Sequence, residues 1–344
     1  MKLNNHVSPL YPWQKDIWSR LCNTSINNRI AHALLFTGPK GVGKLQFAKT
    51  LKNSLLCSEN TPGELACGEC RFCKMQHHPD FHEVTFEEDE RTGKISNSIK
   101  IDQIRKLIDF SLLHTHYGLA KIITIHPAET MTNNAANALL KILEEPPDNT
   151  YFVLICNEIH RLSATIKSRC QRIEFNIPDI EDSTQWLQSH DISEDTASSC
   201  LIFASNAPLA AKILAETNYI EQHSKFIKSL ISIANKSEDP VVIANSWLKI
   251  ESSLPLHALY SCLSDIILLK TVQNSSEITN KLNRDILQNI ANSVGFTGLY
   301  VILDKIILAK PQIQSNVAIL GIYEDILNLW QRLTNNVIPQ VYKG

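Results

Sequence analysis

The sequence of 344 residues has little glycine and almost no net charge. None of its 11 glycines lies between Leu119 and Val294, although average usage of about 7% would place about a dozen there. This gap favours long helices over hairpins. Lys and Arg number 33 against 35 Asp and Glu, so the whole chain has no electrostatic attraction to nucleic acid or to an anionic membrane. Any contact with DNA must therefore be local.

Long hydrophobic runs are also absent. No run approaches the roughly 18 apolar residues that span a bilayer, and the first residues, MKLNNHVSPLYPW, contain no apolar core of a signal peptide. We therefore expect a soluble, cytoplasmic protein that has no membrane partner. A disulfide framework is not expected in such a protein, so its nine cysteines need another explanation.

The order of the predicted elements indicates two kinds of structure, and the length suggests about two or three domains. Up to residue 176, short β-like runs alternate with helical patterns, which is typical of a parallel sheet with helices on both faces. The β-like runs are residues 33–37, 121–125, 151–156 and 172–175. Only helical patterns follow. We therefore predict an α/β domain over residues 1–176, a small helical domain over 177–214 and an all-helical domain over 215–344.

One helix can be delimited closely from its end signals. Thr132 is a suitable N-cap, and apolar residues then recur at helical spacing up to Leu143. The helix must end near Glu145, because Pro146 and Pro147 supply no amide hydrogen and disfavour helical geometry in the residue before them.

Residues 38–44, GPKGVGK, match the G-x-x-x-x-G-K phosphate-binding loop, or P-loop, and stand between a predicted strand and a predicted helix. In a working site of this kind, glycines such as Gly38, Gly41 and Gly43 let backbone amides surround the phosphates at a helix N-terminus. Lys44 would then bridge the outer phosphates. These residues predict a P-loop fold and a candidate nucleotide site.

Two elements that hold magnesium in such sites are missing. The position after the lysine needs a Ser or Thr hydroxyl, but Leu45 cannot bind a metal ion. The strand at 121–125 should end in an acidic pair, but His126 and Pro127 follow it, and Glu129 comes two residues too late. We therefore expect no ATP hydrolysis and no productive binding of ATP and magnesium. Nucleotide binding without turnover stays open.

Four cysteines, Cys57, Cys67, Cys70 and Cys73, lie in a short polar insertion. Three of them are separated by two residues each, a spacing that is typical of metal sites in cytosolic proteins. Four thiolates suit tetrahedral zinc and leave no coordination position for water. We predict a structural zinc site.

Two alternatives at this insertion stay open. The same ligands are compatible with an iron-sulfur cluster. A nearby histidine could also replace one cysteine, the candidates being His77, His78 and His82. The remaining cysteines are predicted to be small core residues: Cys22, Cys156, Cys170, Cys200 and Cys262.

Several motifs together resemble one protein family. They are the four-cysteine insertion and three segments: residues 32–39 (HALLFTGP), 137–147 (NALLKILEEPP) and 168–170 (SRC). The chain resembles the bacterial sliding-clamp loader of DNA polymerase III, an AAA+ assembly, over roughly residues 8 to 215 by motif and beyond them by architecture. A zinc insertion beside a defective ATP site is similar to the loader's non-hydrolysing subunit rather than to its ATP-hydrolysing gamma/tau subunit.

The resemblance implies roles for the domains and for three residues. Residues 1–176 would form the AAA+ domain, 177–214 its lid and 215–344 a collar. Arg169 matches the arginine that enters the ATP site of a neighbouring subunit, an effect worth roughly 10³ to 10⁵ in rate in other NTPases. From position alone, an arginine here would instead close a helix and pair with a surface carboxylate. Asn157 matches a sensor of the γ-phosphate, and Leu209 replaces a second sensor that is normally arginine.

The resemblance also implies partners. They are the gamma/tau and delta subunits of the clamp loader, the sliding clamp and primer-template DNA, so the chain would be part of a DNA-directed DNA polymerase holoenzyme, a nucleotidyltransferase. Three basic residues on one helix are candidates for DNA contact, although such charges usually form the solvated face of a helix: Lys100, Arg105 and Lys106.

Two other functions stay open at this point. The first is an ATP-hydrolysing AAA+ enzyme of clamp-loader type, in which Glu129 or Glu158 replaces the missing acidic pair. The second is a zinc-stabilised nucleic-acid-binding module, whose binding would depend strongly on salt.

Overall fold

The computed structural model describes residues 10–26, 30–60, 63–88, 93, 95–249, 254–272, 278–280, 283–314 and 319–335. Residues 1–9, which begin the N-terminal segment MKLNNHVSPLYPW, lie outside the described residues. Residues 336–344, at the end of the predicted third domain, lie outside them as well. The chain forms two compact units that divide between Lys212 and Ile213.

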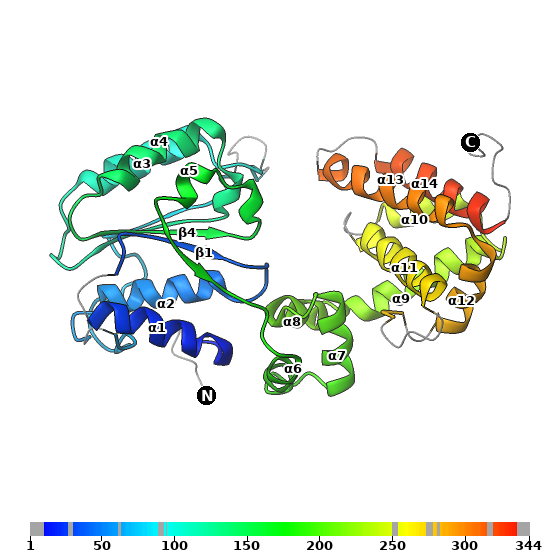
Figure 1. Cartoon of the computed structure of the whole chain (residues 1–344), viewed down its shortest axis with the longest axis horizontal. Helices are drawn as coiled ribbons and strands as arrows, with labels where there is room; N and C mark the ends of the chain where they lie inside the picture. The colour runs from blue at the N-terminus through cyan, green and yellow to red at the C-terminus, as the bar shows by residue number, and fades with distance from the viewer. Residues whose placement is uncertain are drawn as a thin grey trace. The chain divides into compact units, whose positions relative to one another are not determined.

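The first unit is built on a parallel sheet of five strands (Figure 1). The strand order is β2-β3-β4-β1-β5, and the strands are β1 (Ala33–Thr37), β2 (Phe81–Val84), β3 (Lys121–Ile125), β4 (Thr150–Cys156) and β5 (Gln171–Glu174). All residues of β1 and β3 are buried, as expected for parallel strands that are covered on both faces. The predicted α/β fold is confirmed. Strand β2 was not predicted, because its four residues, FHEV, carry two polar side chains and give no apolar run.

Helices cover both faces of this sheet (Figure 1). Helices α1 (Lys15–Ile26) and α2 (Lys44–Leu56) pack on one face, where Phe47 lies in a core cluster with Leu34 and Phe36 of β1. Helices α3 (Ile101–Leu112) and α4 (Asn133–Glu144) pack on the other face against Leu35. Alternate residues of β1 therefore point to opposite faces, as the pleat of a strand requires.

Helix α4 begins and ends where the sequence predicts. The Thr132 side chain accepts a hydrogen bond from the backbone N–H of Ala135, and the helix ends at Glu144. Leu139 and Leu143 are buried in the sheet's core cluster, so the end of α4 is fixed by packing as well as by the prolines that follow it.

Four short helices also belong to the described part of the first unit. Helix η1 (Pro12–Gln14) precedes α1, and η2 (Ala128–Thr130), η3 (Ile159–Arg161) and α5 (Ala164–Lys167) lie between strands β3 and β5 in the chain. Helices α6 (Ile180–Gln188), α7 (Glu194–Phe203) and α8 (Pro208–Glu216) follow the sheet in the chain. Their buried side chains include Leu187, Cys200 and Ala211.

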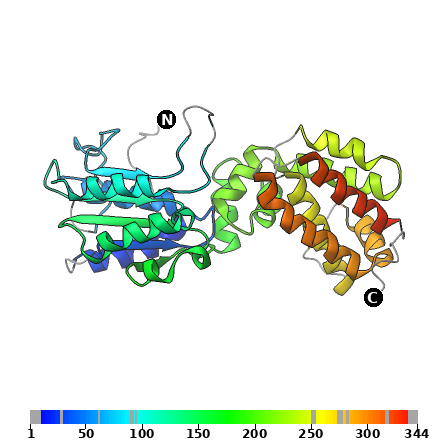
Figure 2. The ribbon, with the colours of Figure 1, turned by 90° about the horizontal axis from the view of Figure 1, so that it is seen from above.

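All the secondary-structure elements described in the second unit are helices, as predicted. Its helices are α9 (Tyr219–Ala234), α10 (Pro240–Trp247), α11 (Leu254–Thr271), α12 (Arg284–Ser293), α13 (Phe296–Gln314) and α14 (Ile319–Thr334). They appear in yellow-green to red in Figure 2. Trp330 is fully buried at the centre of their common core, and its indole N–H donates to the carbonyl of Leu230 at 2.9 Å.

The described helices were also compared in length and hydropathy with what crossing a bilayer requires. No single one is long and apolar enough, although two sharply bent pairs, α7 with α8 and α12 with α13, reach the required length and hydropathy when each is taken together.

Candidate functional site

The predicted P-loop joins the end of β1 to the start of α2. Gly38, Gly41 and Gly43 have φ values of 140°, 89° and 91°, a region that L side chains rarely adopt. A Cβ atom on Gly38 would lie 2.1 Å from the carbonyl oxygen of Phe175, so no other residue fits there. The sequence motif thus folds into a tight glycine turn that opens a helix, and it brings the three glycines and Lys44 together.

Lys44 is turned back onto its own loop. Its side-chain nitrogen donates to the carbonyls of Gly38 and Pro39, at 2.6 Å each, and the residue is only 4% exposed. Burial lowers its pKa to about 8, against the opposing effect of the Glu129 carboxylate. The Lys44 ammonium group therefore donates hydrogen bonds to carbonyls of its own loop. A lysine that binds phosphate would instead point out of the loop.

Two other segments of the first unit donate hydrogen bonds to the second half of the loop. From the N-terminal side, the Trp13 indole donates to the carbonyl of Val42 at 3.0 Å, and the Gln14 amide donates to the carbonyl of Gly43 at 3.0 Å. From α8, the backbone N–H of Leu209 donates to the carbonyl of Gly41 at 3.0 Å. Leu209, which the resemblance aligns with the second sensor, thus contributes a backbone amide and no cationic side chain.

The ends of β3 and β4 lie beside the loop and carry the residues that replace the acidic pair. His126, directly after β3, is 2.7 Å from Glu83 through its Nε2 atom, and this bond holds the pKa of Glu83 below its usual value. A histidine bonded in this way offers no carboxylate for magnesium. The carboxylate of Glu158 forms ion pairs with His160 at 3.6 Å and with Arg161 at 3.5 Å.

Glu129 has a position that sequence reasoning did not foresee. It lies on η2, is only 8% exposed, and accepts hydrogen bonds through Oε1 from both the backbone N–H and the side-chain amide of Asn157, at 3.1 Å each. Its Oε2 atom is buried and has no hydrogen-bond partner among the described residues. The carboxylate also interacts electrostatically with Lys44. The fold therefore brings Asn157 to the P-loop edge and ties it to a buried carboxylate, which only the three-dimensional path after β3 reveals.

The four cysteines of the insertion come together. Their sulfur atoms all lie within 4.8 Å of one another, and the Cys57 sulfur is 3.5 Å from that of Cys67 and 3.8 Å from that of Cys70. A zinc ion with four sulfur ligands at about 2.3 Å requires sulfur-sulfur separations of about 3.8 Å. The donor set therefore fits tetrahedral zinc. Backbone N–H groups of the insertion also donate to the sulfurs of Cys57, Cys67 and Cys70.

No histidine is part of this group of possible ligands within the described residues. The Nδ1 atom of His78 accepts a hydrogen bond from the backbone N–H of Asp80 at 3.1 Å, and its ring packs against Phe72 and Tyr117. Four of the other cysteines are buried and Cys22 is half-buried, in agreement with their predicted places in the core.

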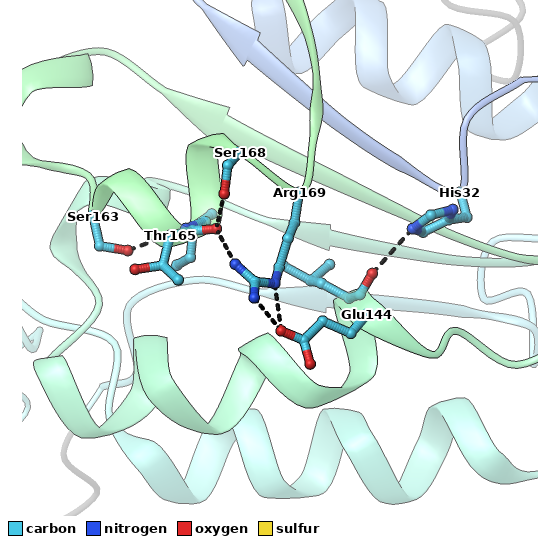
Figure 3. A network of polar contacts seen from close by, with 8 residues as sticks. His32, Glu144, Ser163, Thr165, Ser168 and Arg169 are labelled. Atoms are coloured by element: carbon cyan, nitrogen blue, oxygen red, sulfur yellow. Dashed lines mark hydrogen bonds and ion pairs between the residues drawn. The ribbon is translucent and has the colours of Figure 1, made fainter.

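Arg169 follows the short helix α5 and is bound within its own chain (Figure 3). Its Nε atom donates to Oε1 of Glu144 at 2.6 Å, and its Nη2 atom contacts the same oxygen. Its Nη1 atom donates to the carbonyl of Thr165 at 3.0 Å. The arginine thus forms the surface ion pair that its position alone predicts, and its side chain stays 30% exposed.

Arg169 and the P-loop lie at opposite ends of the parallel strands, which we call the two edges of the sheet. Gln171 of β5 is in register with Leu34 of β1, so Arg169 lies level with the residues just before β1. His32, directly before β1, contacts the carbonyl of Leu143 at 3.0 Å, one residue from Glu144 (Figure 3). The P-loop begins only after the five residues of β1, about 17 Å further along at about 3.3 Å per residue. Arg169 therefore cannot reach a nucleotide bound at the P-loop of its own chain.

Of the three candidate DNA-contacting residues, Lys100 lies directly before α3, and Arg105 and Lys106 lie near its middle. Lys100, Arg105 and Lys106 are exposed, and Arg105 pairs with Asp102 at 3.2 Å. This is an ordinary solvated helix face, and the contact with DNA stays a prediction.

Two family models match the chain. The model described as DNA polymerase III, delta subunit, matches residues 13–179, and the model described as DNA polymerase III, delta subunit, C terminal, matches residues 217–332. The DNA polymerase III subunit delta' of Pseudomonas aeruginosa is 33% identical over 264 residues, which cover 75% of this chain and 76% of that protein. The Escherichia coli subunit delta' is 28% identical over 96% of this chain and 97% of its own length. The subunit tau of Bacillus subtilis is 35% identical over 47% of this chain and 28% of its own length.

Proposed function

The chain belongs to the family of DNA polymerase III delta' subunits, and we propose that it works in the clamp loader without hydrolysing ATP and supplies Arg169 to a neighbouring subunit. One observation carries this proposal. Arg169 lies at the edge of the sheet opposite to its own P-loop, so a phosphate that it contacts must belong to another chain. In that position its guanidinium would stabilise the charge that develops on the phosphates during hydrolysis.

The P-loop edge supports the absence of hydrolysis in this chain. Leu45 provides no hydroxyl for magnesium, and His126 is bonded to Glu83 in the place of an acidic pair. Trp13, Gln14 and the amide of Leu209 donate hydrogen bonds to carbonyls of the loop itself. We therefore propose that Gly38, Gly41, Gly43, Lys44 and Asn157 form a degenerate nucleotide site and that productive binding of ATP with magnesium does not occur there.

We further propose that Cys57, Cys67, Cys70 and Cys73 bind structural zinc. Zinc with four thiolate ligands crosslinks the insertion and has no open position for chemistry. The close packing of the four sulfur atoms supports zinc over a role as isolated thiols.

The remaining assignments follow from the family and are proposals for this chain. Residues 1–176 form the AAA+ domain with the insertion at about 57–73, residues 177–214 the lid and residues 215–344 the collar. The partners are the gamma/tau and delta subunits, the sliding clamp and primer-template DNA, within a cytoplasmic DNA-directed DNA polymerase holoenzyme. The similarity to a tau subunit supports an assembly of related chains.

Replacing Arg169 in the reconstituted complex tests this function. Arg169→Ala should leave assembly intact, because the side chain is partly exposed and its only partners are Glu144 and Thr165 among the described residues. We expect DNA-stimulated ATP hydrolysis at the site that the arginine serves to fall by about 10³-fold or more. Assembly is measured by mass and hydrolysis by phosphate release. Unchanged hydrolysis in a fully assembled complex would refute a role in trans.

One observation favours a second candidate function, ATP hydrolysis by this chain itself. Glu129 is a buried carboxylate beside Lys44 whose Oε2 atom has no hydrogen-bond partner among the described residues. ATP turnover by the purified chain with magnesium, lost on Lys44→Ala, would establish this candidate and overturn our proposal for the P-loop.

A further inference from the structure

The Arg169 guanidinium is bound from two directions. Glu144 accepts from its Nε and Nη2 atoms on one side, and the Thr165 carbonyl accepts from Nη1 on the other (Figure 3). A guanidinium has five N–H donors, and these bonds use three of them. The other two N–H groups have no acceptor in the described part of the chain. They are the groups left to meet a phosphate from outside.

Both groups that bind the guanidinium are attached to well-packed elements. Glu144 is the last residue of α4, whose Leu143 is buried in the core and has its carbonyl in contact with His32 at 3.0 Å. Thr165 lies in α5, which is capped by the Ser163 side chain and packed through the buried Ile166. The side chain of Glu144 is 48% exposed, but its backbone is held in place.

An arginine at a surface has many rotamers, and few of them aim its donors at one external point. Two partners on rigid elements select one rotamer before the neighbouring phosphate arrives. The ordering of a flexible side chain then no longer opposes the interaction in the transition state.

On the basis of the proposed function, we infer that Glu144 is a positioning residue that fixes the orientation of the Arg169 guanidinium for its action in trans. Glu144 does not touch the phosphates itself. It presents one oxygen to the Nε and Nη2 side of the guanidinium, and two other N–H groups keep no acceptor among the described residues.

The test replaces Glu144 in the complete reconstituted complex. For Glu144→Ala we expect kcat of DNA-stimulated ATP hydrolysis to fall about two- to fivefold, the range of a partly exposed ion pair, with the KM for ATP unchanged. Glu144→Gln keeps an oxygen that accepts from the guanidinium and should recover at least half of the lost rate. Glu145→Ala is the matched control, because Glu145 is the next residue, is also exposed, and has no side-chain bond among the described contacts. This control should behave as the unsubstituted complex.

The double variant Glu144→Ala with Arg169→Ala separates this inference from the proposed function. If Glu144 acts through Arg169, the double variant has the same rate as Arg169→Ala alone. A lower rate in the double variant, or a Glu144→Ala rate that is unchanged or increased, overturns the positioning role while Arg169 keeps its own. Full activity of Arg169→Ala overturns the proposed function itself. Assembly of each variant is measured by mass. If Glu144→Ala does not assemble, the kcat of Glu144→Gln is compared with that of Glu145→Ala: a lower kcat supports the positioning role, and an equal kcat overturns it.

Discussion

Removal of one cysteine ligand should abolish zinc binding and loosen only the insertion. We expect the purified chain, prepared under reducing conditions, to hold about one zinc ion, because four sulfur atoms lie within 4.8 Å of one another. Cys73→Ser should retain less than about a tenth of an equivalent, because three thiolates and a hydroxyl bind zinc far more weakly than four thiolates. Cys22→Ser is the control, since Cys22 lies on α1 outside the group and should leave the zinc content unchanged.

The structural effect of that loss can be bounded from the packing. The buried residues of the insertion form a small cluster of their own, Cys57, Ala66 and Cys73, which is separate from the two clusters that pack against the sheet. Loss of zinc should therefore open the segment between Cys57 and Asp80 to proteases while the far-ultraviolet circular dichroism changes little.

Two measurements decide this prediction. Elemental analysis gives the zinc content, and limited proteolysis with mass spectrometry locates the cleavage sites. Less than about half an equivalent of zinc in the unsubstituted, reduced chain would refute the site. Cleavage spread over the whole first unit would refute the local effect.

Two further predictions concern buried titratable groups. Burial lowers the pKa of His223 to about 4, so the unfolded chain, in which a histidine titrates near 6.5, binds more protons below that pH. The contribution of His223 to the free energy of unfolding should fall by about 3 kcal/mol between pH 7 and pH 4, and denaturant titrations of His223→Asn should show a flatter profile. Glu129→Ala should cost about 1 to 3 kcal/mol, because two N–H groups of Asn157 lose their acceptor, whereas Glu129→Gln keeps an oxygen there and should cost less than half as much. Equal losses in the two Glu129 variants, measured by urea denaturation, would contradict that account.

Elements with local signals could be predicted from the sequence. The ends of α4 follow from Thr132 and from the two prolines, which act within a few residues of the helix. The glycine turn after β1 follows from a motif in which each glycine has a steric reason, such as the contact of Gly38 with Phe175. Such features depend on residues that are neighbours in the chain, so the sequence alone predicts them.

Features that depend on tertiary contacts could not be predicted from the sequence. Strand β2 has the polar residues His82 and Glu83 and is recognisable only by its pairing with β3. Glu129 and Asn157 are far apart in the sequence, and their hydrogen bonds arise because the chain turns back after β3. The partner of Arg169 was foreseen as a kind of residue, a surface carboxylate, but its identity as Glu144 depends on how α4 and α5 meet.

On our proposal, the two edges of the sheet explain how a chain that does not hydrolyse ATP can still function in an assembly of related subunits. In a parallel sheet, the residues before the strands and the residues after them lie at opposite edges, so one chain presents Arg169 and its P-loop to different surroundings. A P-loop edge without magnesium-binding residues would leave the arginine edge unchanged, because neither Glu144 nor Thr165, which bind Arg169, belongs to the P-loop. On our proposal, the chain therefore contributes to hydrolysis in a neighbouring subunit although it performs none itself. If Arg169 and Glu144 act as one unit, substitutions at the P-loop edge, such as Lys44→Ala, should leave that contribution intact, and a loss of ATP hydrolysis in such a complex would show that the two edges are coupled.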